Sequence, residues 1–287
     1  MRAKPHVVPW LMLSPALVML SVFLIYPMVN AIALSFTSWD GISDPAPVGL
    51  RNFGRLVADP HVTTALLNHL KMALVLPLWV LIPYAVAMAL NTKPPGWKFF
   101  RLALFLPAVT APLILGIYYG LLLAPEGPLN HALGMLGLPD RIEWLNSPSL
   151  TVWVVIAILI WSTIGIGSLI FLAAFEAIDL QQVEAAKLDG ANWWQIQRHV
   201  VIWQMIHAIR FWAILVVILS FTGVFPLVYA LTQGGPGYSS YFMDFAIYQE
   251  AFQNSRLGYA SALAVALVLL LAIVAMVQFR AGRRRNA

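Results

Sequence analysis

The chain has 287 residues, of which 61% are hydrophobic and only 10% are charged, and its mean hydropathy is +0.80. Soluble domains carry about 25% charged residues, so this composition excludes an ordinary soluble protein and predicts an integral membrane protein. The net charge is +5, but the basic residues lie beside apolar segments, which argues against nucleic-acid binding. The absence of cysteine excludes disulfides, thiolate metal sites and cysteine nucleophiles.

Six apolar segments are long enough to cross a hydrocarbon core of about 30 Å as helices. β-Barrel strands would be about ten residues long with alternating polarity, which does not fit these segments. We therefore predict an all-α polytopic membrane protein, a single domain over residues 1–287. The predicted spans are 10–36, 65–90, 99–123, 150–175, 208–231 and 257–279.

The basic residues indicate how the spans are oriented. Arg2 and Lys4 precede the first span as in a signal peptide, but the apolar run is too long for one and lacks a clear cleavage site. We therefore predict a retained span with its N-terminus inside. Twelve Lys and Arg residues then lie on the inner side and five on the outer side. The positive-inside rule places both termini in the cytoplasm, with Arg283–Arg285 as an anchor at anionic headgroups.

Prolines recur within the predicted spans. Each one lacks a backbone N–H and frees a carbonyl, which kinks a helix. In lipid such kinks are tolerated where a neighbouring helix or an internal cavity satisfies the backbone, so they suggest a bundle with an internal path. The prolines concerned are Pro15, Pro27, Pro77, Pro83, Pro107, Pro112 and Pro226.

Small and polar residues in the fourth and fifth spans have two interpretations. Gly165 and Gly167, within Trp161–Ser168, permit close helix packing, and the neighbouring hydroxyls can hydrogen-bond locally. Alternatively, such groups line a polar substrate path. The path candidates are Trp161, Ser162 and Ser168 in the fourth span and Thr222 and Tyr229 in the fifth.

Ionisable residues are almost absent from the span centres, and Lys71 near the outer end of the second span can snorkel. Proton- or sodium-coupled carriers use buried ionisable groups at mid-membrane, so we expect the energy source to lie outside this chain. The sequence contains no paired carboxylates or metal-binding histidine pattern in a plausible pocket. We therefore expect no enzymatic site, no metal site and no cofactor bound by this chain.

The outer loop that follows the fifth span begins with a turn motif. Gly234, Gly235, Pro236 and Gly237 suit a tight turn that leaves a helix. The chain has no phosphate-binding loop pattern, so this is not a nucleotide site. The motif is either a simple turn or a rigid external contact loop.

The segment 176–207 is the one long polar stretch between apolar runs, and the orientation places it in the cytoplasm. Asp179 with Gln182 predicts a helix that starts at Leu180, and Asp189–Gly190 predicts its end, with glycine in the left-handed conformation. Asn192 with Gln195 predicts the start of a second helix. A first arm of about ten residues is marginal alone, so it packs either on a partner protein or on its own bundle.

At this segment the chain resembles a known family. Residues Glu184, Ala185, Ala186 and Gly190 form an E-A-A-x-x-x-G pattern, with Asp189 as its usual companion, similar to the EAA motif of binding-protein-dependent ABC importer permeases. The family's motif proline is Trp203 here. Further stretches resemble the carbohydrate branch, of the maltose and glycerol-3-phosphate type. They are Tyr26–Gly41, Gly49–Leu56, Phe100–Pro112, Leu227–Gly237 and Leu257–Ala264.

The resemblance implies a sugar-importing permease subunit of the inner membrane. Its implied partners are a second, similar permease, two cytoplasmic ATPase subunits that bind ATP and Mg²⁺, and an extracytoplasmic solute-binding protein. Glu184, Ala185, Ala186, Asp189 and Gly190 would form a coupling helix seated on an ATPase, and Gly234–Gly237 would face the binding protein. The alternative is a stand-alone secondary carrier or channel for a small polar solute.

Overall fold

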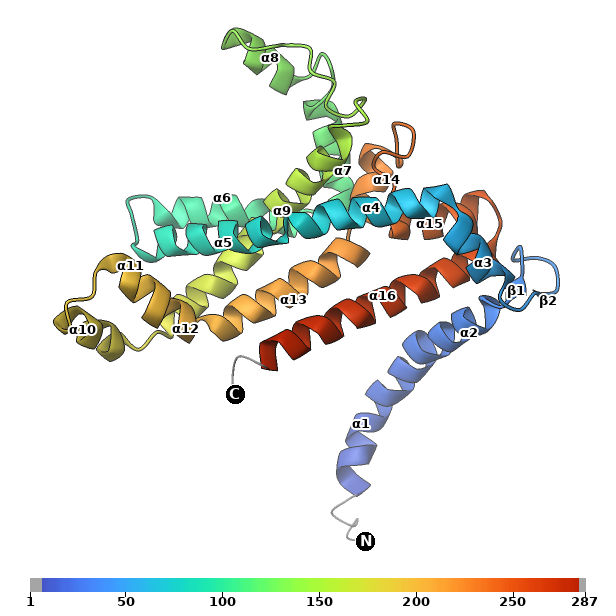
Figure 1. Cartoon of the computed structure of the whole chain (residues 1–287), viewed down its shortest axis with the longest axis horizontal. Helices are drawn as coiled ribbons and strands as arrows, with labels where there is room; N and C mark the ends of the chain where they lie inside the picture. Colours follow the sequence, from blue (N-terminus) through green and yellow to red (C-terminus); the bar gives the residue numbers. More distant parts are fainter. Residues whose placement is uncertain (1–6, 284–287) are drawn as a thin grey trace. The chain divides into compact units, whose positions relative to one another are not determined.

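The computed structural model describes residues 7–283, and nearly all of the secondary structure in them is helical (Figure 1). By length and composition, four helical segments can each cross a membrane, and two bent helix pairs raise the number to six. The all-α prediction with six transmembrane segments is therefore confirmed as a fold class. Four basic residues that the predicted orientation counts on the inner side lie outside the described residues. They are Arg2, Lys4, Arg284 and Arg285.

The elements follow one another in this order along the chain. Before the fourth span they are α1 (Val7–Leu20), α2 (Tyr26–Leu34), β1 (Thr37–Ser38), β2 (Ala46–Pro47), α3 (Arg51–Ala58), α4 (Pro60–Leu74), α5 (Leu76–Asn91), α6 (Trp97–Val109), α7 (Pro112–Leu122) and α8 (Pro128–Met135). From there on they are α9 (Thr151–Glu176), α10 (Leu180–Leu188), α11 (Trp193–Ile196), α12 (Ile202–Gln204), α13 (Ile206–Thr222), α14 (Phe225–Leu231), α15 (Met243–Tyr248) and α16 (Leu257–Arg283). Short π-helical turns lie at Ser21–Ile25, Gln197–Val201 and Gln249–Gln253.

Prolines break the third predicted span as expected. α6 and α7 meet at an angle of 104°, so residues 99–123 do not form one straight helix. The residue before a proline disfavours the helical region, and Ala111 before Pro112 is accordingly extended, with ψ of 133°. Pro77 likewise stands in the first turn of α5, immediately after the break at Val75.

The predicted fifth span, 208–231, is interrupted near Pro226, one of the prolines predicted to kink a span. α13 ends at Thr222, and α14 begins at Phe225 with Pro226 in its first turn. Proline lacks an N–H and fits the first turn of a new helix better than the interior of an existing one. α14 packs on α7, where the space beside Gly116 is filled by the Ala230 side chain and the Leu227 carbonyl.

Contacts divide the described residues into two compact units, one formed by 7–62 with 246–270 and the other by 63–245 with 271–283. In the first unit, the Asn52 amide donates to the carbonyls of Ser35 and Thr37 at 2.8 Å each. The N–H of Gly258 donates to the Trp39 carbonyl at 3.1 Å, and the Tyr259 hydroxyl donates to Asp59 at 3.0 Å. These bonds hold the β1–β2 hairpin and α3 against the start of α16.

The second unit is built around α9, which packs against α5, α6 and α13. A Cβ on Gly165 would lie 2.4 Å from the Leu104 carbonyl oxygen, so α6 and α9 touch through their backbones. A Cβ on Gly167 would lie 2.7 Å from Pro83 and from the Trp212 ring. Both glycines therefore serve helix packing, the simpler of the two interpretations of this stretch.

Polar side chains of α4 hold the loop before α15. Asn68 is fully buried and donates to the carbonyls of Ser239 and Tyr241 at 3.0 and 2.9 Å. The neighbouring His69 accepts from the N–H of Met243 at 3.3 Å and stacks on Phe221. Lys71 donates to Asn68 at 3.0 Å, so its ammonium group is hydrogen-bonded within the protein.

Asp244 joins this same region to the break between α13 and α14. Its carboxylate accepts from the N–H of Phe225, at the start of α14, and from the N–H of Phe245. Burial raises the pKa of this carboxyl group from its ordinary 3.8 to about 6, and these backbone bonds oppose the rise only in part. Asp244 therefore caps a helix at the cost of burying an ionisable group.

We expect the stability of the protein to fall as pH rises from 4 to 6. The folded-state pKa of Asp244 lies above the unfolded value, so folding favours the protonated form and this stabilisation is lost as pH passes about 6. The loss is about 3 kcal/mol. Thermal unfolding of the detergent-solubilised protein should give a higher Tm at pH 5 than at pH 7, and Asp244→Asn should flatten the difference. Identical pH profiles for the two proteins would contradict this assignment.

Candidate functional site

The 176–207 segment forms the predicted helix–turn–helix hairpin. Asp179 accepts from the N–H of Gln181, and α10 begins at Leu180. Gly190 ends that arm in the left-handed conformation with φ of 82°. Asn192 and Gln195 make a complete capping box at the start of α11. The local structure predicted from the sequence is confirmed here. Figure 1 shows α10 and α11 at the opposite end of α9 from α8.

The hairpin presents the EAA residues on its surface. Glu184, Ala185, Asp189 and Gly190 are exposed, and Ala186 is half-buried. Ala186, Asp189 and Gly190 line one side of a groove of about 300 Å³. The other side is formed by Gln195, Ile196, His199 and Val200. The structure therefore brings most of the predicted coupling residues together at one accessible place.

Two apolar side chains on this hairpin are exposed to a degree that the sequence reasoning missed. Leu188, near the turn, is 90% exposed, and Trp194 in α11 is 75% exposed. Burying a large apolar side chain contributes about 1.5–3 kcal/mol, so these two groups favour a covered position. The sequence did contain a signal for these exposed apolar groups, namely a leucine and two adjacent tryptophans within a polar stretch.

Gln204 ties the start of α10 to the end of α12. Its side-chain oxygen accepts from the N–H of Asp179 at 2.8 Å, and its amide donates to Gln182 at 3.2 Å. Gln182 in turn donates to the Asp179 carboxylate at 3.2 Å. These three hydrogen bonds join Asp179, Gln182 and Gln204 in a ring, which we call the Gln204 latch. Sequence reasoning missed it because Gln204 is 25 residues from Asp179.

The chain turns back toward α13 without the family's proline. Trp193–Gln204 and Ile206–Thr222 meet at 69°, and the turn lies at Met205. Trp203 stands just before this turn and its side chain is half-exposed. The bend is therefore made by the backbone around a buried Met205, next to the Gln204 latch.

The five path candidates are distributed over three helices. Ser168 is buried in α9 and donates to the Ile164 carbonyl at 2.7 Å. Ser162 and Thr222 likewise donate to carbonyls within their own helices. Trp161 and Tyr229 are partly exposed. None of the five lines the groove beside the EAA residues, and their role in a path stays a prediction.

The predicted turn after the fifth span is confirmed as local structure. Gly234 and Gly237 have φ of 81° and 55°, values that glycine adopts without strain. Ser240 is fully buried, and its hydroxyl donates to the Gly235 carbonyl at 2.7 Å. The 234–237 turn is therefore held rigidly. Among residues 7–283, no group of three His, Cys, Asp or Glu side chains is placed to hold a metal ion.

Membrane-spanning helices joined to a capped polar hairpin are consistent with the membrane component of a transport system. The chain belongs to the family described as the binding-protein-dependent transport system inner membrane component, whose model matches residues 53–286. The family resemblance seen in the EAA stretch is thereby confirmed.

Curated relatives agree with this family, and a solved structure shares the fold. The chain is 32% identical to the sn-glycerol-3-phosphate transport system permease protein UgpA of Salmonella choleraesuis, covering 95% of this chain and 92% of that protein. It is 30% identical to the lactose transport system permease protein LacF of Rhizobium radiobacter, covering 96% and 94%. It also resembles a chain in the structure of a bacterial alginate ABC transporter in complex with an alginate pentasaccharide-bound periplasmic protein. That match has a TM-score of 0.80 and 22% identity, and covers 96% of this chain and 94% of that chain.

Proposed function

We propose that the chain is the permease subunit of an ATP-driven importer for a carbohydrate or a related polyol-type solute. Family membership supports the transport role, and the named relatives handle lactose and glycerol 3-phosphate. The solute crosses the cytoplasmic membrane between this subunit and a second, homologous permease. Trp161, Ser162, Ser168, Thr222 and Tyr229 remain the candidates for its path.

The proposed orientation places both termini and the α10–α11 hairpin in the cytoplasm and the 234–237 turn outside. Two cytoplasmic ATPase subunits would bind ATP and Mg²⁺, so this chain needs no cofactor and catalyses no reaction. A solute-binding protein would deliver the solute to the outer face. ATP-driven closure of the ATPases would then move the hairpin, and with it the spans, to switch access from outside to inside.

The observation that carries this proposal is the exposed surface of the hairpin. Glu184 offers a carboxylate for a partner's basic group, and Leu188 and Trp194 offer apolar area. The arm is too short to be stable alone in water, yet its caps and the Gln204 latch hold it in one geometry. Such a rigid, partly apolar projection suits insertion into a groove of an ATPase.

Purification and reconstitution test the proposal. The tagged chain should co-purify with an ATPase and a second permease, and liposomes holding the complex should import sugar only with ATP and the binding protein. Transport of the same sugar by the purified chain alone would contradict the proposal and favour a stand-alone carrier.

Gln204→Ala should reduce sugar imported per ATP hydrolysed by about three- to tenfold, since it removes two hydrogen bonds that orient α10. ATP hydrolysis by the assembled complex should continue, because the variant leaves the ATPase intact. Gln181→Ala is the matched control, because its side chain makes no described hydrogen bond within residues 7–283. Equal transport ratios for the two variants would show that the latch does not orient α10.

A further inference from the structure

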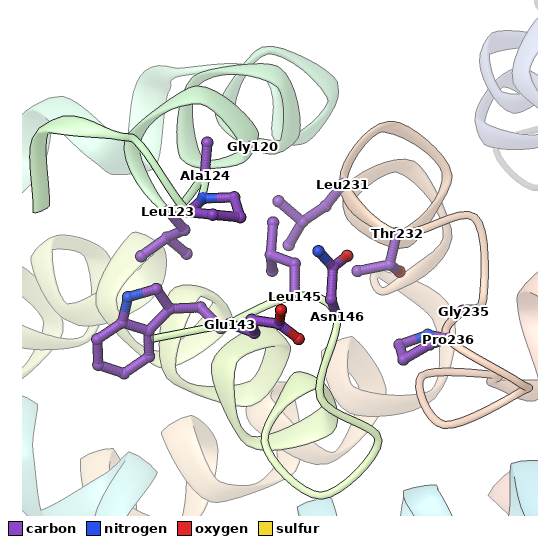
Figure 2. Close-up of a pocket in the computed structure, with 12 residues that line it drawn as sticks. Gly120, Leu123, Ala124, Glu143, Leu145, Asn146, Leu231, Thr232, Gly235 and Pro236 are labelled. Atoms are coloured by element: carbon purple, nitrogen blue, oxygen red, sulfur yellow. The ribbon is translucent and has the colours of Figure 1, made fainter. Parts of the chain in front are cut away.

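A cavity of about 360 Å³ lies at the far end of α9 from the coupling hairpin. Its walls are the end of α7, the end of α14 with the 235–236 part of the turn, and the 143–146 segment between α8 and α9. Figure 2 shows the Glu143 carboxylate and the Asn146 amide directed toward the open-sided space between Ala124, Leu231 and Pro236. The volume is within the range of about 300–1,000 Å³ that is usual for small-molecule sites.

Buried polar side chains hold all three walls in place. Asn130 is 1% exposed, and it donates to the carbonyls of Pro125 and Ile142 and accepts from the Trp144 indole at 2.9 Å. Thr151 is fully buried and donates to the Ser147 carbonyl at 2.7 Å, beside a 3.1 Å contact with the Leu145 carbonyl. The Ser240 bond to Gly235 holds the third wall. The cavity is therefore preorganised by hydrogen bonds rather than formed by a loose loop.

The lining has the chemistry of a site for hydroxyl groups. The side chains of Glu143 and Asn146 make no hydrogen bond to any residue in 7–283, so four lone-pair sites of a carboxylate and both ends of an amide are available. Leu123, Leu145 and Leu231 and the two prolines supply apolar walls. Trp144 also lines the cavity, with its N–H already bonded to Asn130. A small number of polar groups set in an apolar wall is the usual composition of a ligand pocket.

The charge of the cavity lining favours some hydroxylated solutes over others. Glu143 is the only charged residue among the twelve that line the cavity. A carboxylate attracts hydroxyl donors and repels a phosphate or a uronate. The site therefore suits an uncharged sugar better than a sugar phosphate or an acidic polysaccharide.

We propose that this cavity is an entry subsite for a neutral carbohydrate, with Glu143 and Asn146 as its hydrogen-bonding residues. The proposal rests on the proposed import function, which places the cavity on the outer face beside the turn that would meet the binding protein. Asn130 acts as a positioning residue that holds Trp144 and the 142–146 backbone. The subsite would receive the sugar before it passes between the permeases.

Binding is measured on the purified full chain in lipid nanodiscs by saturation-transfer NMR. The probes are maltotriose and lactose as neutral sugars, and glycerol 3-phosphate and a mannuronate trisaccharide as anionic ones. We expect at least one neutral probe to bind with a millimolar Kd and the anionic probes to bind more weakly. The Glu143→Ala/Asn146→Ala variant should weaken neutral-sugar binding by at least about tenfold, because two groups that hydrogen-bond the sugar are lost. Glu126→Ala is the control, since this exposed carboxylate between α7 and α8 does not line the cavity.

Equal binding by the wild type and the double variant would overturn the proposal, as would no binding of either neutral probe or a preference for the anionic probes. The reconstituted importer separates this result from the proposed function. Sugar binding without ATP-driven import would refute the import function and leave the site standing. Import together with unchanged binding by the double variant would refute the site alone.

Discussion

Replacing Gly258 with alanine is expected to prevent the chain from accumulating as a folded membrane protein. The new Cβ would lie 2.1 Å from the carbonyl oxygen of Thr37 and 3.1 Å from the N atom of Trp39. Both are backbone atoms, so no side-chain rotation relieves the clash. Relief requires β1 to separate from α16, which breaks the bond from Gly258 N–H to the Trp39 carbonyl. We expect a loss of more than about 3 kcal/mol of stability.

Size-exclusion chromatography and thermal unfolding of the solubilised protein measure this effect. Gly54→Ala is the matched control in the same unit, because the space that its new Cβ would occupy is open to a distance of 4 Å. Alanine in a helix interior is favoured over glycine by about 1 kcal/mol, so this control should be neutral or slightly stabilising. If the two variants melt at the same temperature, the close approach of Gly258 to β1 does not exist in the folded protein.

Gly190→Val is expected to lower import by the proposed transporter at least tenfold while the protein is still made and inserted. Gly190 has φ of 82°, a conformation that costs other L-residues about 1–2 kcal/mol and β-branched ones more. The space around its Cβ position is open to 4 Å, so the substitution acts through backbone strain and not through a clash. The strain would shift the turn that sets α10 against α11 and move Glu184 and Leu188 off the proposed ATPase partner.

Gly137→Val controls for strain alone. Gly137 has φ of 73°, equally open surroundings and a place in the loop after α8, away from the hairpin. Its substitution should reduce stability by a similar amount and leave the sugar transported per ATP unchanged. Import and ATP hydrolysis in liposomes measure both variants. Normal import by Gly190→Val would exclude a role for this turn in coupling.

The local structure of the α10–α11 hairpin could be predicted from neighbouring residues. Asp179, Gly190 and Asn192 act on backbone groups within a few positions of themselves, so their residue types and spacing were sufficient to predict both arms. The Gln204 latch was not predictable in this way. Any of several glutamines can reach a free N–H, and which one does depends on the 69° bend.

The structural role of the residues in the family-like stretches became visible only in the three-dimensional structure. Asn52 comes from one similar stretch, and Gly258 and Tyr259 come from another. In the first unit Asn52 and Gly258 bond to carbonyls in and beside β1, and Tyr259 bonds to Asp59 just after α3. The resemblance identified these stretches as characteristic of the family without showing what each residue does. Their tight spacing explains why glycine and asparagine stand at those positions.

The sequence by itself determined the membrane class, the helical architecture, the breaks before Pro77, Pro112 and Pro226 and the capped hairpin, because hydropathy, missing N–H groups and caps act over short distances along the chain. Only the tertiary structure decided that Gly165 and Gly167 pack helices and that α14 packs on α7. It also brought Glu143 and Asn146 to a cavity framed by Asn130, Thr151 and Ser240. Those outcomes depend on which distant backbones approach one another, and residue spacing along one chain does not specify that.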